Sequence, residues 1–277
     1  MAELLQMSAV VPVRDEEANI APLVAELARA LAPFGQGGAG WEIVYVDDGS
    51  RDGTRAALDK AVAGTPGLVV RRHAKSRGQS AALLTGVRAA RAPWIVTLDG
   101  DGQNDPADIA GLVAARDRLL AAPGGGAPGS TSVMICGRRA RRRDTALRRL
   151  SSRVANAVRA AALGDRTPDT GCSLKLFRRA DFLDLPAFDH MHRFLPALML
   201  RHGARVVSVD VGHRPRWSGR SNYGVFDRLW VGIADLFGVM WLMRRPCRPA
   251  LDAPANDAAA EPQNHAAAEP QDHTERP

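Results

Sequence analysis

The feature that most constrains the fold is a regular alternation between short β-rich runs and longer segments of helical periodicity. The runs are apolar and are bounded by turn residues, as expected of buried strands. They lie at Met7–Val13, Trp41–Val46, Leu68–His73, Trp94–Leu98 and Ser132–Cys136, with clear helical periodicity in Ala18–Leu31 and Ser80–Arg91. This alternation predicts an α/β fold with one largely parallel sheet flanked by helices.

Acidic residues follow three of the predicted strands. The three segments are Arg14-Asp15-Glu16-Glu17, Asp47-Asp48-Gly49-Ser50 and Asp99-Gly100-Asp101. Because ligands of such sheets bind at the carboxyl ends of the strands, we expect these side chains to line one site.

The segment from Trp94 to Pro106 carries the strongest chemical signal. An apolar strand ends in Asp99, Asp101 and Gln103, and Pro106 then opens a helix. Two carboxylates at this spacing on an extended loop can face one ion, and hard cations such as Mg²⁺ or Mn²⁺ prefer oxygen ligands. A nucleoside diphosphate leaving group needs such an ion to neutralise its charge. The alternative is a polar turn without a ligand.

The other two acidic segments indicate which kinds of group can bind the phosphates of a ligand. Asp47 and Asp48 can accept hydrogen bonds from a base or a ribose. The first segment places carboxylates where a dinucleotide-binding unit would place glycines, and no GxxxxGK[ST] motif occurs. We therefore expect the metal and basic side chains to bind the phosphates. Lys75, Arg77 and Gly78 are candidates, with a solvated basic loop as the alternative.

Several motifs together resemble one protein family. They are Pro12–Ile20, Asp47–Thr54, Arg77-Gly78, Asp99–Pro106, Gly137-Arg138-Arg139, Asp169–Lys175 and Gly219–Gly224. In this order they are similar to the signature of family 2 glycosyltransferases with the GT-A fold, and within that family to the polyprenyl-phosphate sugar transferases. The resemblance covers about residues 5 to 245.

The resemblance implies roles for residues at matching positions. Pro12, Arg14, Glu16 and Asp47 would hold the nucleotide, although Arg14 stands where many members carry Tyr. Asp99, Asp101 and Gln103 match the metal-binding cluster. The predicted nucleotide site is completed by Asp48, Arg77, Asp99 and Gly100, and Asp99, Asp101 and Arg138 are the predicted catalytic residues.

Basic residues later in the chain are predicted to bind the acceptor. Eight arginines lie between Arg138 and Arg153, and guanidinium groups suit both phosphates and anionic lipid. A nucleic-acid patch is the rival interpretation, but aromatic RNA-binding motifs are missing, so we expect no nucleic-acid partner. The predicted acceptor site, which the resemblance supports, comprises Arg138, Arg139, Arg149, Arg153, Lys175, His192, Arg193, Arg214, Arg220 and Ser221. His190 and His192, two positions apart, are a weak candidate for a metal or acid/base site, and packing at a helix start is the alternative for His190.

The chain is predicted to divide into three parts: a GT-A catalytic domain at 1–222, an amphipathic interfacial helix at 223–245 and a disordered tail at 246–277. The helix has charges that interrupt any apolar run long enough to span a bilayer, and packing on the protein or on a second subunit is its alternative role. In the second case the protein would form a homo-oligomer. The tail has almost no large apolar residues.

Charge and cysteines indicate the compartment. The net charge of +7 favours anionic partners. Cys136, Cys172 and Cys247 form no CxxC pair, and the N-terminus lacks the pattern of a secretory signal. We expect a cytoplasmic protein at the inner face of the cell membrane.

The sequence thus predicts an inverting, metal-dependent transferase that moves a sugar from a UDP- or GDP-linked donor to a polyprenyl phosphate. One alternative is transfer to a sugar hydroxyl, for which Asp169 is the obvious candidate base. The other is a non-catalytic module that binds nucleotide sugars.

Overall fold

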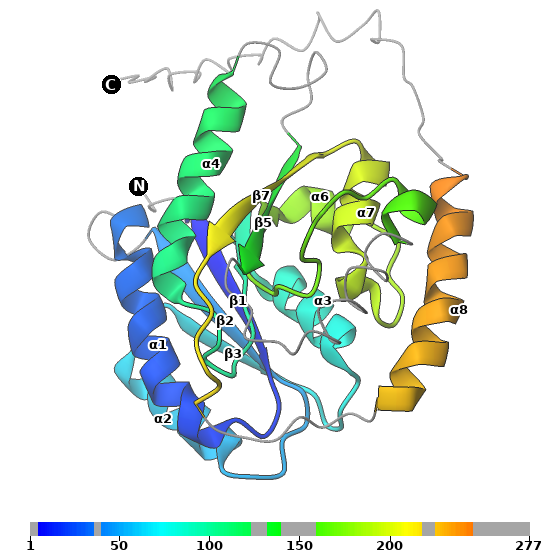
Figure 1. The fold of residues 1–277 in the computed structure, drawn as a ribbon. Helices are drawn as coiled ribbons and strands as arrows, with labels where there is room; N and C mark the ends of the chain where they lie inside the picture. Colours follow the sequence, from blue (N-terminus) through cyan, green and yellow to red (C-terminus); the bar gives the residue numbers. More distant parts are fainter. Residues whose placement is uncertain (1–4, 36–39, 123–131, 140–158, 218–224, 246–277) are drawn as a thin grey trace, which may run out of the picture. The chain divides into compact units, whose positions relative to one another are not determined.

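The structure, a computed structural model, describes residues 5–35, 40–122, 132–139, 159–217 and 225–245. These residues contain a sheet of seven strands in the order β3-β2-β1-β4-β6-β5-β7 (Figure 1). The strands are β1 (Met7–Val13), β2 (Trp41–Asp47), β3 (Leu68–Arg72), β4 (Trp94–Thr97), β5 (Val133–Arg139), β6 (Lys175–Arg178) and β7 (Arg205–Val211). All neighbouring strands are parallel except where β6 pairs with β4 and β5.

The helices of the described residues connect these strands. They are α1 (Glu17–Leu31), α2 (Thr54–Gly64), α3 (Gln79–Ala89), α4 (Ile109–Ala121), α6 (Arg179–Leu183), α7 (Leu195–His202) and α8 (Val225–Met243), with short 3-10 turns η1 (Ala32–Phe34), η2 (Pro106–Asp108) and η3 (Met191–Arg193). A further short helical segment lies at 159–163.

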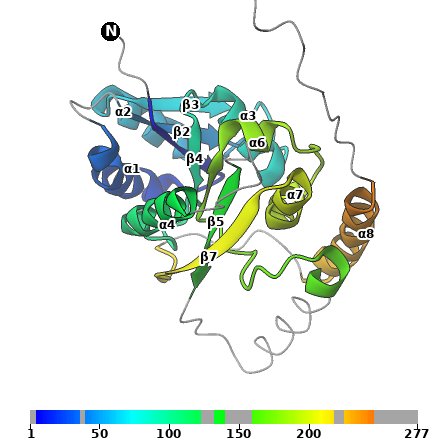
Figure 2. The same ribbon diagram turned by 90° about the horizontal axis from the view of Figure 1, so that it is seen from above.

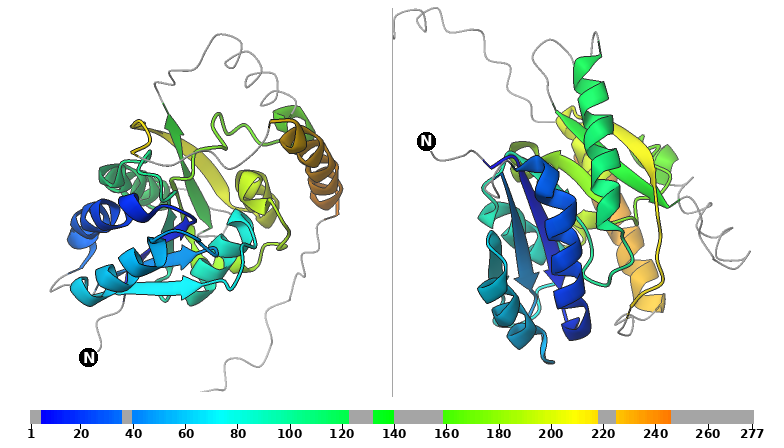
Figure 3. Two further views of the ribbon diagram at one scale, coloured as in Figure 1. Left: turned by 90° about the horizontal axis from the view of Figure 1, so that it is seen from below. Right: turned by 90° about the vertical axis from the view of Figure 1, so that its left-hand side faces the viewer.

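Strand β1 shows how the sequence builds two layers of helices on the sheet. Its alternate residues Ala9, Val11 and Val13 join a buried cluster with α1, α2 and α4. Val10 points to the other face and joins a cluster with α3, α6, α7 and α8. Because side chains alternate between faces, a run that is apolar at every position is buried on both sides. Figure 2 shows the two layers, and the right-hand view of Figure 3 looks onto α1 and α4.

The ends of β1, β2 and β4 meet at one edge of the sheet. Val13 lies opposite Asp47 in the β1–β2 pair, and the Asp48 backbone N–H donates to the Val13 carbonyl at 2.9 Å. On the other side of β1, Val10 lies opposite Thr97 of β4. The three acidic segments therefore leave the sheet side by side, at the ends of neighbouring parallel strands.

The five predicted strands are all present, but two further strands were not predicted. β6 is only four residues long, and its burial depends on β4 and β5, which are far away in the sequence. β7 lies at the edge of the sheet and is half-exposed along most of its length. The predicted tail at 246–277 lies outside the described residues.

Candidate active site

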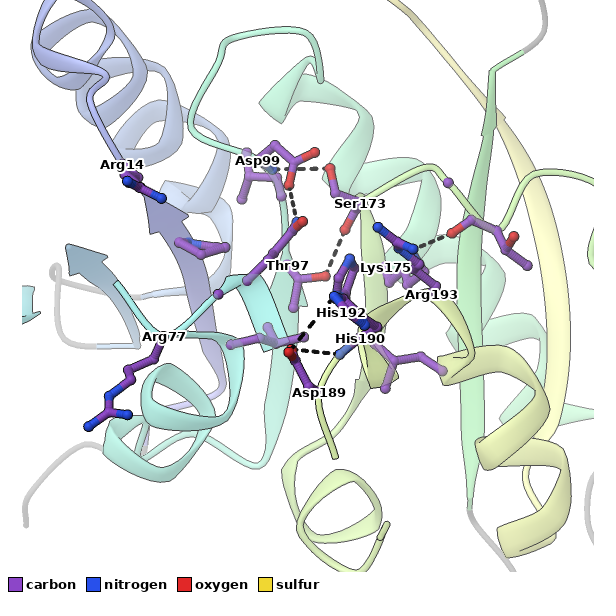
Figure 4. A pocket seen from close by; sticks show the side chains of 18 of the residues that line it. Arg14, Arg77, Thr97, Asp99, Ser173, Lys175, Asp189, His190, His192 and Arg193 are labelled. Carbon is purple, nitrogen blue, oxygen red and sulfur yellow. Dashed lines mark hydrogen bonds and ion pairs between the residues drawn. The ribbon is translucent and has the colours of Figure 1, made fainter. Parts of the chain in front are cut away.

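A cavity of about 1020 Å³ lies where β1 and β4 end and α3 begins (Figure 4). Its walls come from five parts of the chain: Pro12 and Arg14 at the end of β1, Ser76–Gln79 at the start of α3, Thr97–Asp99 at the end of β4, and two later segments at 170–175 and 189–195. Arg14, Arg77, Lys175 and Arg193 line it together with the acidic Asp99 and Asp189. The excess of fixed positive charge favours an anionic ligand.

Asp48 holds the loop that carries Arg77 into the cavity wall. Its carboxylate accepts hydrogen bonds from the Ser76 hydroxyl at 2.7 Å and from the backbone N–H groups of Arg77 and Gly78 at 2.8 and 2.9 Å. Burial acts to raise the pKa of Asp48, but these hydrogen bonds and the one to His73 outweigh it and lower that pKa. The contacts therefore favour an indirect role for Asp48, in which it positions the 76–78 loop.

Arg14 reaches the same loop from the end of β1. One guanidinium nitrogen, Nη1, donates to the Ser76 hydroxyl at 3.1 Å, and both Pro12 and Arg14 line the cavity. Arg14 thus links the end of β1 to the 76–78 loop at the wall of the cavity.

Asp99 lines the cavity two residues after the end of β4. Its backbone N–H donates to the Ser173 hydroxyl at 3.1 Å, and its Oδ1 accepts from the Gln79 amide at 2.8 Å. Burial and the nearby Asp101 carboxylate raise the pKa of Asp99. A carboxylate in this position is stabilised by any cation that binds beside it.

Asp101 is paired with a residue from the segment after β7. Its carboxylate is 7% exposed, and Oδ2 accepts a hydrogen bond from the Arg216 guanidinium at 2.9 Å. The Trp217 ring lies so close to Gly102 that a Cβ there would approach it to 2.5 Å. The segment at 214–217 therefore covers the acidic loop.

Gly100 brings this loop close to β1. A Cβ on Gly100 would lie 2.3 Å from a methyl group of Val13, so a residue without a side chain is needed for the approach. Gln103 contributes its backbone, whose N–H donates to Asp101 Oδ1 at 3.0 Å and whose carbonyl accepts from Arg214 N–H at 2.9 Å. The predicted ligand side chains of Asp101 and Gln103 do not line the cavity, whereas Asp99 does.

The residues of this loop fit a hard divalent cation by their chemistry. Asp101 is a nearly buried carboxylate beside a second one, Asp99, and its present counter-charge is the Arg216 guanidinium. A buried carboxylate needs such a positive partner. Within the described ranges no cluster of three His, Cys, Asp or Glu side chains is preformed. Mg²⁺ commonly binds through one or two carboxylates and completes its shell with water and substrate phosphates.

Two further predicted nucleotide residues, Glu16 and Asp47, do not line the cavity: Glu16 lies near Asp101 and Arg216, and Asp47 ends β2. Burial raises the pKa of Glu16 to about 7, with Arg216 opposing and Asp101 adding to the shift. Asn19 donates a hydrogen bond to the Glu16 carboxylate. Asp47 is buried, and its Oδ1 accepts from the Ser50 N–H at 2.9 Å.

Three predicted acceptor residues line the far side of the cavity. The Lys175 ammonium group donates to the carbonyls of Thr170 and Cys172, and Arg193 follows His192 on η3. The His192 ring contacts the Ser80 hydroxyl at 2.8 Å, and burial lowers the pKa of His192 to about 3, so this ring is neutral.

Two arginines of β5, Arg138 and Arg139, also belong to the predicted acceptor site. They do not line the cavity, and each forms an ion pair elsewhere. Arg138 pairs with Asp210 of β7 at the exposed sheet surface, through hydrogen bonds of 2.5 and 2.9 Å. Arg139 forms a two-pronged pair with Asp169 at 2.7 and 2.8 Å, and the hydrogen bond to Asp169 raises the Arg139 pKa. Asp169 is thereby held by a guanidinium group, which disfavours it as a general base.

Arg214 also lies away from the cavity lining, where its guanidinium group donates to Glu26 at 2.8 Å and pairs with Asp105. It fastens the 214–217 segment to α1 and to the acidic loop. Arg149, Arg153, Arg220 and Ser221 lie outside the described residues.

The sequence reasoning missed several residues of the site. Gln79, which follows the Arg77-Gly78 motif, and Ser173, which lies within the Asp169–Lys175 motif, contact Asp99 directly. Asp189 lines the cavity and Arg216 pairs with Asp101, although both are far from the acidic loop in the sequence. Only the fold could reveal these last two neighbours.

The C-terminal helix α8 has one buried and one exposed apolar face. Val239 is 1% exposed and joins the core cluster with α7, whereas Phe237 and Trp241 are 65% and 59% exposed. The Arg245 guanidinium lies 5.6 Å from the Trp241 ring centre. None of the helices described here combines the length and the apolar character required to cross a membrane.

Comparison with known proteins identifies the family. The model of the family described as "Glycosyl transferase family 2" matches residues 8–185. A "Dodecaprenyl-phosphate galacturonate synthase" of Rhizobium johnstonii is 35% identical over 88% of this chain and 69% of that protein. An "Undecaprenyl-phosphate 4-deoxy-4-formamido-L-arabinose transferase" of Shewanella sediminis is 32% identical over 80% of this chain and 62% of its own length. The chain thus spans about two thirds of these relatives.

Solved structures confirm the GT-A architecture that the motifs implied. Glucosyl-3-phosphoglycerate synthase of Mycobacterium tuberculosis aligns with a TM-score of 0.55 at 19% identity, over 86% of this chain and 80% of that one. A mannosyltransferase of Pyrobaculum calidifontis aligns with a TM-score of 0.52 at 19% identity, over 89% of this chain and 66% of that one. With the acidic strand ends, the cationic cavity and the family match in agreement, the chain belongs to glycosyl transferase family 2.

Proposed function

We propose that the protein transfers a sugar from a nucleotide sugar to a polyprenyl phosphate, by a metal-dependent single displacement that inverts the anomeric centre. The observation that carries this proposal is the cavity itself. It joins Asp99, next to the predicted metal ligand Asp101, with basic residues from two parts of its lining, Arg14 and Arg77 in one and Lys175 and Arg193 in the other. Two separate groups of cations suit two phosphate-bearing ligands, one donor and one acceptor.

The donor's diphosphate would lie on the side of Arg14, Arg77 and Asp99. The acidic loop would hold Mg²⁺ or Mn²⁺ through Asp99 and Asp101, with Gln103 as the predicted third ligand. When bound, the ion neutralises the charge on the departing nucleoside diphosphate. The glucosyl-3-phosphoglycerate synthase and the mannosyltransferase were crystallised with Mn²⁺ and with UDP or GDP-Man, which supports both a divalent ion and a UDP- or GDP-linked donor.

The acceptor's phosphate would lie on the side of Lys175 and Arg193. One phosphate oxygen attacks the anomeric carbon as the bond to the diphosphate breaks. A phosphate monoester has a second pKa near 6 and is largely anionic at neutral pH, so it needs no strong general base. Positioning and electrostatics then supply most of the rate.

Two observations favour a lipid-linked phosphate over a sugar hydroxyl. A hydroxyl acceptor needs a base, and the proposed base Asp169 is held by Arg139. The two relatives named above carry dodecaprenyl phosphate and undecaprenyl phosphate in their names. We place the protein at the inner face of the cell membrane, with the exposed apolar face of α8 toward the lipid.

A transfer assay with purified protein tests the proposal. Undecaprenyl phosphate and soluble glycans are offered separately as acceptors, with a panel of UDP- and GDP-sugars that includes UDP-galacturonic acid, in Mn²⁺ or in EDTA. The expected result is a glycosylated lipid that forms only with the metal. Transfer to glycans alone would favour the hydroxyl-acceptor enzyme, and binding of a nucleotide sugar without any transfer or hydrolysis would favour the non-catalytic module.

A further inference from the structure

Asp235 is a carboxylate on the inward face of α8. Its neighbours on that face, Leu236, Val239 and Met240, pack against the core, and the Asp235 side chain is 19% exposed. An apolar residue would pack at this position at lower desolvation cost, because a buried charge is unfavourable without a partner. We therefore expect the Asp235 carboxylate to have a specific polar partner.

That interaction is with His190, which lines the cavity. The Asp235 Oδ2 atom lies 3.1 Å from Nδ1 of the His190 ring. This oxygen is buried, and no atom of the described residues makes a geometrically complete hydrogen bond to it. The χ2 torsion of histidine is soft, so a small ring rotation aligns the Nδ1–H bond with the carboxylate.

His190 itself is held in an unusual backbone conformation. Its φ of +63° is in the left-handed region, which is costly for a residue with a side chain. The conformation is stabilised by Asp189, whose Oδ1 accepts the His190 backbone N–H at 2.9 Å. As Figure 4 shows, Asp189 and His190 lie together in the wall of the cavity, near His192 and Arg193.

We propose that Asp235 is a positioning residue that acts through His190 on the acceptor. With Nδ1–H directed at Asp235, the second ring nitrogen, Nε2, lies 3.8 Å from Asp189 Oδ2, which is longer than a hydrogen bond, so Nε2 can still bind a ligand in the cavity. Nε2 of His190 then binds the acceptor's phosphate next to Arg193. Nε2 and the phosphate share one hydrogen in either protonation state. A protonated ring donates it to P–O⁻, and a neutral ring accepts it from P–OH. This inference rests on the proposed function.

Kinetics of single and double variants of the full chain test the inference. Asp235→Ala and His190→Asn each remove one partner, and Asn tolerates the left-handed conformation. Each change is expected to raise the KM for undecaprenyl phosphate about tenfold, as for loss of a hydrogen bond to a charged group, and to leave the KM for the donor unchanged. The double variant should be no worse than either single variant, since both changes break one linkage. Asp235→Asn, which retains an acceptor oxygen, should restore part of the loss.

Met240→Ala is the matched control, because it loosens the inward face of α8 more than one helical turn beyond Asp235. Its acceptor KM should stay near that of the wild type. Equal effects on donor and acceptor, an additive double variant, or a Met240→Ala variant as impaired as Asp235→Ala would each overturn the inference.

A spectroscopic measurement separates this inference from the proposed function. Long-range ¹H–¹⁵N spectra of the histidine rings, with His190 assigned through His190→Asn, report which ring nitrogen is protonated. The wild type should show a protonated Nδ1 that is lost or shifted in Asp235→Ala. An unchanged His190 signal in that variant would refute the linkage. The expected change in a protein that transfers no sugar would leave the linkage standing and refute the proposed function alone.

Discussion

At the residue scale, the carboxylates of the site differ in their partners, and the partner decides what each one can do. Asp48 accepts hydrogen bonds from the 76–78 loop and positions it. Asp169 is held by Arg139. Asp101 is paired with Arg216, whose guanidinium group supplies the positive charge that a bound cation would otherwise provide. The residue types indicate carboxylate chemistry, but only these contacts separate binding residues from supporting ones.

Glu16 gives a prediction for the pH dependence of stability. Burial raises its pKa from 4.5 to about 7 in the folded protein, so the folded state binds this proton more tightly than the unfolded state. The stabilisation is present below pH 4.5 and is lost as the pH rises to about 7. Glu16→Gln, which is always neutral, should match the wild type in Tm near pH 4.5 and exceed it at pH 8, measured in EDTA.

Asp117→Asn is the control for this experiment, because the Asp117 side chain is 57% exposed on α4. Its Tm difference from the wild type should not change across the same pH range. A Glu16→Gln variant whose difference from the wild type is also constant with pH would contradict the assignment.

At the element scale, the close approach of α3 to β1 places the 76–79 segment at the cavity. Gly86 of α3 makes this possible, because a Cβ there would lie 2.4 Å from a methyl group of Val10. Since the N-terminus of α3 carries Gln79, which donates to Asp99, any shift of the helix is transmitted to the site.

Gly86→Ala should therefore destabilise the protein by about 1–3 kcal/mol, as expected of overpacking in a core, and should weaken nucleotide binding as well. Chemical denaturation and calorimetric titration measure the two effects. The matched helical control is Gly111→Ala in α4, where an added Cβ meets nothing within 4 Å. It should stabilise the protein by about 0.5–1 kcal/mol, because alanine is the better helix former. A Gly86→Ala variant as stable as this control would show that the contact is not tight.

The elements also show what could be predicted from the sequence and what could not. β1, β2 and β4 each contain an unbroken run of apolar residues, which predicts burial on both faces of the sheet. β6 and β7 were missed, because a four-residue strand and a half-exposed edge strand carry little local signal. In the site, the position of Asp99 in the sequence, just after an apolar strand, was enough to predict it as a site residue. The pairing of Asp101 with Arg216 depends on a contact across 115 positions, for which the sequence gives no local sign.

At the scale of the whole molecule, α8 joins the cavity side of the protein to an exposed apolar surface. Its inward face packs on the core and presents Asp235 to His190, and its outward face exposes Ile233, Phe237 and Trp241 at helical spacing. Such a face, with arginines at its end, is suited to the interfacial region of an anionic membrane.

The double variant Phe237→Ser/Trp241→Ser should bind anionic liposomes at least about tenfold more weakly than the wild type, since each side chain loses apolar burial in the lipid. Sedimentation with the vesicles measures this. Leu120→Ser, at an exposed apolar residue of α4, is the control and should sediment like the wild type. Equal sedimentation of all three proteins would leave α8 with a purely structural role.

The central claim is that the acidic loop holds a divalent ion and, through it, the donor's diphosphate. Calorimetric titration of UDP and GDP into the wild type and into Asp101→Asn, with Mn²⁺ and with EDTA, tests it most directly. We predict that the wild type binds one of the two nucleotides with Mn²⁺ at least about 10²-fold more tightly than with EDTA, and that Asp101→Asn loses this dependence. Equal binding with and without Mn²⁺ in the wild type, or an undiminished Mn²⁺ effect in Asp101→Asn, would contradict the account.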